Sequence, residues 1–194
     1  YRENKITERR QLVASKAKIL GLPFVYCNII GGQDELIFDG SSFVMSKDGI
    51  LLSQAKSFDE ELKIIDLGHP SKTKYLPIPR EEEIFNTLCL GVKDYFSKTS
   101  HEKAVIGLSG GIDSALVASI AVNALGNKNV CGISLPSKFS SKHSLIDARQ
   151  LAANLKIDYQ VIKIHSLVQS FHETLKPNFR SKDPNIAEEN IQSR

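Results

Sequence analysis

The stretch with the most recognisable chemistry is VIGLSGGIDSALVASIAVNALG, residues 105–126. It passes from a β-branched run through paired glycines into an alanine-rich segment of helical character. Glycines let a ligand approach the main chain, and the start of a helix offers unpaired N–H groups and the positive end of a dipole. Ser109 and Ser114 add hydroxyl donors. This corner therefore predicts a site for an anion.

Asp113 is the residue at this corner that conflicts with a bare anion, because like charges repel. A magnesium ion resolves the conflict, since it commonly bridges a carboxylate and phosphate oxygens. Two other phosphate motifs do not fit: the sequence has no GxxxxGK[ST], and no GxGxxG occurs at this strand end. A structural alternative stays open, in which the glycines only make a tight turn and Asp113 caps the helix.

The pattern S-G-G-x-D-S resembles the signature of the PP-loop ATP pyrophosphatases. Those enzymes cleave ATP between the α and β phosphates to activate a carboxyl or carbonyl group as an adenylate. The resemblance implies that Asp113 helps to bind magnesium. It also implies that ATP binds to Gly107, Leu108, Ser109, Gly110, Gly111, Ile112, Asp113 and Ser114.

Two later stretches are similar to the NAD synthetases among these enzymes. GISLPSKFSSKHSLIDARQLAANLKID, residues 132–158, resembles the segment that follows their PP-loop, and EENIQSR, residues 188–194, resembles a helix that contacts deamido-NAD. By this resemblance Asn190 binds deamido-NAD, with Glu189 and Arg194 as weaker candidates. Ser140 and Ser141 follow a strand end, where open α/β sheets bind their ligands.

The first third of the chain carries a second resemblance. YCNIIGGQDELIFDGSSFVMSKDGILLSQAKSF, residues 26–58, looks like the end of a nitrilase-superfamily glutaminase. Such a domain joined to a PP-loop domain is the arrangement of the glutamine-dependent NAD synthetases, so the chain is identified as a central fragment of a member of that family. Lys5 matches a position that binds glutamine. The catalytic Glu-Lys-Cys triad is expected upstream of Tyr1, and no catalytic residue is assigned in this fragment.

The elements that must position these residues follow from hydrophobic periodicity and turn signals. The first part reads as a helix over 4–20, a buried strand over 23–30 that contains Cys27 as a small buried thiol, a polar loop over 31–42, a hairpin over 43–55 turning at Asp48-Gly49, and a strand over 62–67. The second part reads as helices near 80–97, 113–125, 143–155 and 166–175, alternating with strands at 104–109, 129–135 and 159–164.

This rhythm predicts an α/β protein with two parts. Residues 1–68 are expected to be the C-terminal part of a nitrilase-like αββα sandwich, residues 69–80 a proline-containing linker, and residues 81–194 the N-terminal part of a PP-loop domain. In the PP-loop part we expect a parallel sheet with helices on both faces. Alternation of strands with helices of about a dozen residues is typical of such sheets.

Composition narrows the function classes. The 194 residues are 41% hydrophobic and 24% charged, with a net charge of +3 and no dense basic block, so we expect no nucleic-acid partner. No apolar run is long enough to span a membrane. Three scattered cysteines without ligand spacing favour a reducing, cytoplasmic location. The five histidines lack accompanying ligands at metal spacing.

The predicted function is amidation of deamido-NAD to NAD with ATP and magnesium, through an adenylate, using ammonia released from glutamine. The partners are therefore small molecules, and the resemblance suggests a homo-oligomer. Two alternatives stay open: another PP-loop ligase with a different acceptor, and a nucleotide-binding fragment that is catalytically incomplete. A stand-alone nitrilase amidase does not account for the second half of the chain. We expect this fragment alone to be inactive.

Overall fold

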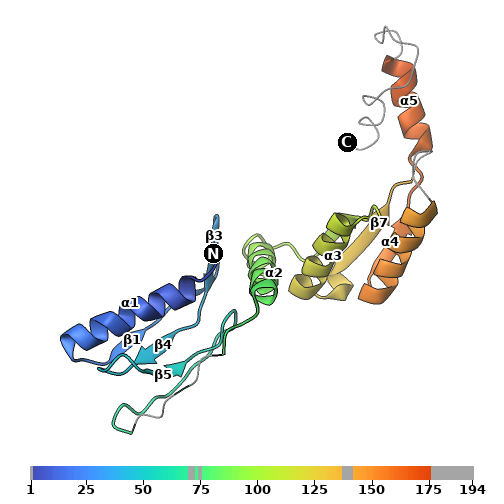
Figure 1. The fold of residues 1–194 in the computed structure, drawn as a ribbon. Coiled ribbons are helices and arrows are strands. Elements are labelled where there is room, and N and C mark those ends of the chain that lie inside the picture. The colour runs from blue at the N-terminus through green and yellow to red at the C-terminus, as the bar shows by residue number, and fades with distance from the viewer. Residues whose placement is uncertain (1, 70–72, 74–75, 137–141, 176–194) are drawn as a thin grey trace. The chain divides into compact units, whose positions relative to one another are not determined.

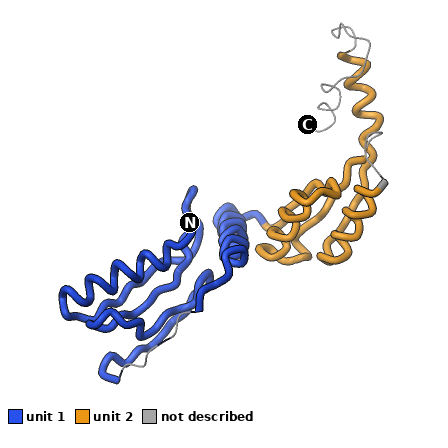
Figure 2. The backbone as a smooth tube through the Cα atoms, viewed as in Figure 1, with its two compact units in different colours: residues 1–101 blue, residues 102–194 orange. Residues whose placement is uncertain are grey.

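The computed structural model describes residues 2–69, 73, 76–136 and 142–175 of the chain. The chain divides into two compact units, Tyr1–His101 and Glu102–Arg194 (Figure 2). Each unit has its own sheet and its own helices (Figure 1). Each helix in the described part of the chain is too short or too polar to cross a membrane.

The first unit packs a long helix against an antiparallel sheet. Helix α1 (Lys5–Leu20) ends at Gly21, whose φ of +64° makes the left-handed cap that glycine favours. It lies against the sheet β1-β4-β5, built from Phe24–Tyr26, Phe43–Met45 and Leu51–Gln54. The predicted hairpin at Asp48-Gly49 is confirmed, because β4 and β5 pair antiparallel and Gly49 has a φ of +73°.

The segment expected to be a polar loop instead forms a second hairpin. Strand β2 (Ile30–Gln33) pairs antiparallel with β3 (Leu36–Asp39), and a two-residue turn, with Asp34 at a φ of +53°, joins them. Helix α2 (Arg80–Lys98) packs on this hairpin. The loop prediction was wrong because paired glycines and acidic residues hide the strand pattern, and the helix that packs on the hairpin lies some sixty residues later.

Two further expectations for the first unit were wrong. Residues 62–67 form no strand: Leu62 and Ile64 are 95% and 96% exposed, and Ile65 alone among these six residues is partly buried. The strand predicted over 23–30 is interrupted after β1, and Cys27 lies in that interruption with an exposed thiol. Burial of a strand residue needs a neighbouring layer, which periodicity alone cannot reveal.

The second unit follows the predicted alternation. Strands β6 (Ala104–Gly107), β7 (Val130–Ser134) and β8 (Asp158–Val161) form a parallel sheet in the order β6-β7-β8. Between them run α3 (Ile112–Leu125), a 3-10 turn (Asn127–Asn129) and α4 (Lys142–Leu155), and α5 (His165–Leu175) follows β8. The α/β class and the parallel sheet are confirmed.

The core of the second unit is made of small side chains. Ala118 on α3 and Ala148 on α4 are fully buried, so the two helices pack closely against each other and against the sheet. The buried cluster comprises Leu108, Ala118, Ala121, Val130, Ala148, Ala152 and Ile157. Because Leu108 belongs to this cluster, the residue that precedes the S-G-G-x-D-S loop is anchored in the core.

Candidate functional site

The S-G-G-x-D-S loop lies at the carboxyl end of β6. The strand ends at Gly107, Leu108 is buried, and the chain surfaces at Ser109 before α3 begins at Ile112. Ligands of open α/β sheets bind beyond the carboxyl ends of the strands. The loop therefore occupies the position where this sheet type binds nucleotides.

Gly110 is held where no side chain fits. Its φ is +83°, and a Cβ at this position would lie 2.3 Å from the carbonyl oxygen of Ser144 and 2.6 Å from its Cα. Ser144 is on α4, so the glycine lets the loop pass directly against the backbone of the next helix. Gly110 thus serves a close approach between two elements, beyond making a turn.

The two serine hydroxyls converge inside the loop. Ser109 Oγ and Ser114 Oγ are 3.1 Å apart, and Gly111 N–H donates to Ser109 Oγ over 3.2 Å. Ser114 Oγ donates to the carbonyl oxygen of Gly111 over 3.0 Å. These bonds hold the loop in one shape and bring the two hydroxyl groups together at the start of α3. Serine hydroxyls and the unpaired N–H groups at a helix start are the kinds of group that bind phosphate.

Asp113 lies in the first turn of α3 and is exposed. The N-cap residue of this helix is Gly111, which makes no side-chain cap hydrogen bond. The alternative in which Asp113 caps the helix therefore does not hold, because Asp113 is two residues inside it. Its carboxylate belongs to the same helix turn that offers the phosphate donors, where it would repel a bound phosphate unless a cation lay between them.

A single carboxylate at this site fits a magnesium ion that binds together with a phosphate-containing molecule. No group of three His, Cys, Asp or Glu residues that could enclose a metal exists among the residues the structure describes. Magnesium binds in many nucleotide sites through one or two carboxylates, with phosphate oxygens and water completing its octahedron. Asp113 can supply one such carboxylate, with Ser109 and Ser114 nearby.

A buried chain of hydrogen bonds holds Leu108, the residue that precedes the loop. Ser134 at the end of β7 is 3% exposed and donates to the carbonyl oxygen of Leu108 over 2.7 Å. Tyr159 on β8 donates its hydroxyl to Ser134 Oγ over 2.8 Å. Three neighbouring strands are thereby tied together directly before the loop. Ser134 and Tyr159 were not predicted, because only the register of the parallel sheet brings them next to Leu108.

The first unit places Lys5 beside a cavity of about 420 Å³. Lys5 is half exposed and pairs with Glu8 over 3.3 Å. The floor holds a buried ion pair, in which Arg9 donates to Asp39 over 2.7 Å, and Asn28 Nδ2 donates to the same carboxylate over 3.0 Å. Asn28 and Asp39 lie in the stretch 26–58 that resembles a glutaminase, but nothing in the sequence indicated the ion pair between Arg9 and Asp39.

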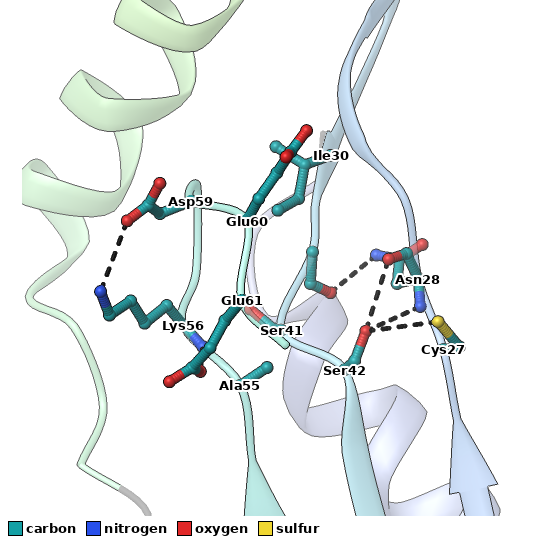
Figure 3. A pocket seen from close by; sticks show the side chains of 11 residues that line it. Cys27, Asn28, Ile30, Ser41, Ser42, Ala55, Lys56, Asp59, Glu60 and Glu61 are labelled. Carbon is teal, nitrogen blue, oxygen red and sulfur yellow. Dashed lines mark hydrogen bonds and ion pairs between the residues drawn. The ribbon is translucent and has the colours of Figure 1, made fainter. Parts of the chain in front are cut away.

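A second, smaller cavity of about 200 Å³ lies on the other side of Asn28. Figure 3 shows Cys27, Asn28 and Ser42 on one side and the acidic residues of 59–61 on the other. Asn28 N–H donates to Ser42 Oγ over 2.9 Å, and Ser42 Oγ lies 4.0 Å from the Cys27 sulfur. These polar contacts join the segment after β1 to the residue that precedes β4.

Several predicted residues lie outside the described residues: Ser140, Ser141, Glu189, Asn190 and Arg194. The structure therefore brings together residues 107–114 of the predicted site and places Lys5 in the other unit, beside its own cavity.

Comparison with known proteins found relatives over nearly the whole chain. The family model for NAD synthase matches residues 84–194. A glutamine-dependent NAD(+) synthetase from Synechocystis sp. is 43% identical over 192 residues, which are 96% of this chain and 34% of that protein. One from Thermotoga maritima is 39% identical over 231 residues, covering 100% of this chain and 40% of that protein.

A solved structure extends the likeness to three dimensions. A glutamine-dependent NAD+ synthetase from Acinetobacter baumannii, in complex with adenosine diphosphate, matches with a TM-score of 0.91 and 38% identity. The match covers 99% of this chain and 38% of that one. The chain thus spans between 34% and 40% of the length of these three relatives.

Proposed function

This chain belongs to the NAD synthase family, and from that premise we propose that it is the central part of a glutamine-dependent NAD synthetase. The observation that carries the proposal is the loop of residues 107–114, which lies inside the matched region and presents phosphate donors beside an exposed carboxylate. The reaction is the ATP-dependent amidation of deamido-NAD to NAD, with release of AMP and pyrophosphate. The division into residues 1–68, 69–80 and 81–194 is part of this proposal.

In this proposal the loop holds the phosphates of ATP. Main-chain N–H groups at the start of α3, together with Ser109 and Ser114, donate to phosphate oxygens. Magnesium, held in part by Asp113, neutralises phosphate charge when bound. The nicotinate carboxylate of deamido-NAD then attacks the α-phosphorus, pyrophosphate leaves, and ammonia displaces AMP from the adenylate. The protein contributes orientation and charge stabilisation, since the carboxylate itself is the nucleophile.

The nitrogen comes from glutamine in a glutaminase part to which the first unit belongs. Lys5 is the proposed glutamine contact, at the rim of the cavity that contains the Arg9–Asp39 pair. Asn190 is the proposed deamido-NAD contact. A homo-oligomeric, cytoplasmic enzyme without nucleic-acid partners completes the proposal.

The test uses the full-length enzyme with ATP, magnesium, deamido-NAD and either ammonium or glutamine, and resolves AMP from ADP. AMP and NAD from both nitrogen sources are expected. Production of ADP would contradict the adenylate mechanism, AMP without NAD would favour another PP-loop ligase, and ATP binding without turnover would favour a nucleotide-binding scaffold.

A variant pair sharpens this test. Asp113→Asn is expected to raise the magnesium concentration needed for half-maximal NAD formation. The matched control is Asp158→Asn, an exposed aspartate at the start of β8. Equal magnesium dependence of both variants and the parent enzyme would show that Asp113 is not a magnesium ligand.

A further inference from the structure

The nucleotide loop, our name for the S-G-G-x-D-S segment, starts at a peptide unit that is hydrogen-bonded at both ends. The carbonyl oxygen of Leu108 accepts the hydroxyl of Ser134 over 2.7 Å, and the N–H of Ser109 donates to Ser114 Oγ over 3.3 Å. We propose that Ser134, with Tyr159 behind it, is a positioning residue for ATP binding, because it fixes the direction of the first N–H of the loop. This inference deepens the proposed function and rests on it.

The geometry of the peptide bond links these two hydrogen bonds. A trans peptide is planar, so its C=O and N–H groups point in opposite directions. Because Ser134 is 3% exposed, its hydroxyl holds the Leu108 carbonyl towards the core. The N–H of Ser109 must then point the other way, into the exposed loop, where Ser114 Oγ accepts it. A phosphate oxygen can replace Ser114 Oγ as the acceptor when ATP binds.

Strand β7 holds Leu108 by its backbone and by its side chain. Leu108 N–H donates to the Ile133 carbonyl over 2.8 Å, which continues the β6–β7 ladder by one residue. The Leu108 carbonyl, by contrast, accepts a side chain, the hydroxyl of Ser134. A Cβ on Gly132 would lie 2.5 Å from Leu108 Cδ1, so this glycine leaves the room that the leucine side chain occupies. The end of β7 therefore fixes Leu108 before the loop begins.

Tyr159 fixes the direction in which Ser134 donates. Its hydroxyl lies 2.8 Å from Ser134 Oγ, and its ring packs against the buried cluster of the second unit. A carbonyl oxygen only accepts, so Ser134 donates its one proton to Leu108 and accepts from Tyr159. Hydrogen bonds in such a chain polarise and strengthen one another. The chain runs from β8 to the first turn of α3, through Tyr159, Ser134, the Leu108–Ser109 peptide and Ser114.

The experiment measures MgATP binding by titration calorimetry and the ammonium-dependent reaction, both with the full-length enzyme. Ser134→Ala should raise the Kd for MgATP and the KM for ATP about five- to tenfold, the size expected when one hydrogen bond is lost. The KM for ammonium should stay unchanged. Ser119→Ala is the matched control, because Ser119 Oγ also donates to a backbone carbonyl, that of Ala115, over 2.8 Å. This control should leave all three constants at the parent values.

A second substitution tests whether Tyr159 acts through Ser134. Tyr159→Phe should raise the Kd for MgATP and the KM for ATP about two- to threefold, because the Ser134 hydroxyl remains but loses its donor. Added to Ser134→Ala, it should change them no further, since two residues that act through one contact are not additive. Effects of the two substitutions that multiply would contradict the chain.

The remaining outcomes separate this inference from the proposed function. Equal Kd values for Ser134→Ala, Ser119→Ala and the parent enzyme would overturn the inference. So would a rise of the KM for ammonium as large as that for ATP together with a lower melting temperature, because that pattern indicates support of the fold alone. A parent enzyme that binds MgATP but forms no NAD would contradict the proposed function, and the Kd comparison would still decide the inference. A parent enzyme that does not bind MgATP would overturn both.

Discussion

Gly110 sets the shape of the nucleotide loop because a side chain there would overlap the backbone of Ser144. Gly110→Ala is expected to weaken ATP binding strongly, measured as the KM for ATP in the ammonium-dependent reaction. The matched control is Gly126→Ala, which has a similar φ of +84° but no atom within 4 Å of the added Cβ. Both variants pay a backbone strain of about 1–3 kcal/mol. An equal KM in the two variants would show that the close approach to α4 is not needed.

Asp94 makes a pH-dependent contribution to the stability of the folded protein. Hydrogen bonds from Lys98 and the Gly32 backbone lower the pKa of Asp94 in the folded protein. Its pairing therefore stabilises the fold fully above the pKa of the unfolded chain, about 3.9. This stabilisation is lost as the pH falls through the lower pKa of the folded protein. The difference in melting temperature between the parent and Asp94→Asn should be constant from pH 7 down to about pH 5 and shrink towards pH 3. A difference that grows on acidification would contradict this sign.

Among the elements, α1 and β3 are joined by the buried pair Arg9–Asp39, whose side chains are 14% and 12% exposed. Asp39→Ala should destabilise the first unit by about 3–5 kcal/mol, because it leaves a buried guanidinium without its partner. Adding Arg9→Met should recover part of the loss. Thermal denaturation followed by circular dichroism measures both.

A surface pair provides the control for this prediction. Arg2 and Glu8 also form an ion pair, but their side chains are 64% and 47% exposed, so Glu8→Ala should leave the melting temperature unchanged. A loss for Glu8→Ala as large as that for Asp39→Ala would show that burial does not decide the strength of these pairs.

At the scale of the whole molecule, each unit has a core of its own, so damage to one core should stay local. Ala148→Leu overfills the α3–α4 contact and should cost about 1–3 kcal/mol. Hydrogen exchange should accelerate in β6–β8 and stay unchanged in β1, β4 and β5. Ala153→Leu, on the exposed side of the same helix, is the control. Faster exchange throughout the chain would show that the two units unfold as one.

For the described residues of the second unit, the sequence by itself determined the order of the strands and helices. β6, the S-G-G-x-D-S loop and α3 were readable because local signals agree: a β-branched run, glycines at the turn and an alanine-rich helix. The alternation that follows requires a parallel sheet, and the carboxyl end of its strand is where a ligand binds. The serines and the aspartate of that loop predict phosphate and magnesium binding, and this stays a prediction.

Only the tertiary structure decided the features that depend on distant partners. The hydrogen bonds of Asp94 and Lys98 to Gly32, the Arg9–Asp39 pair and the Ser134–Tyr159 hydrogen bond join residues from 25 to 66 positions apart. The β2–β3 hairpin itself is local, but the helix that packs on it lies some sixty residues later. The apolar run at 62–67 forms no strand, and its Leu62 and Ile64 are almost fully exposed. Cys27, predicted to be buried, is exposed as well. Periodicity reports which face of a segment is apolar; whether another element covers that face is settled by packing.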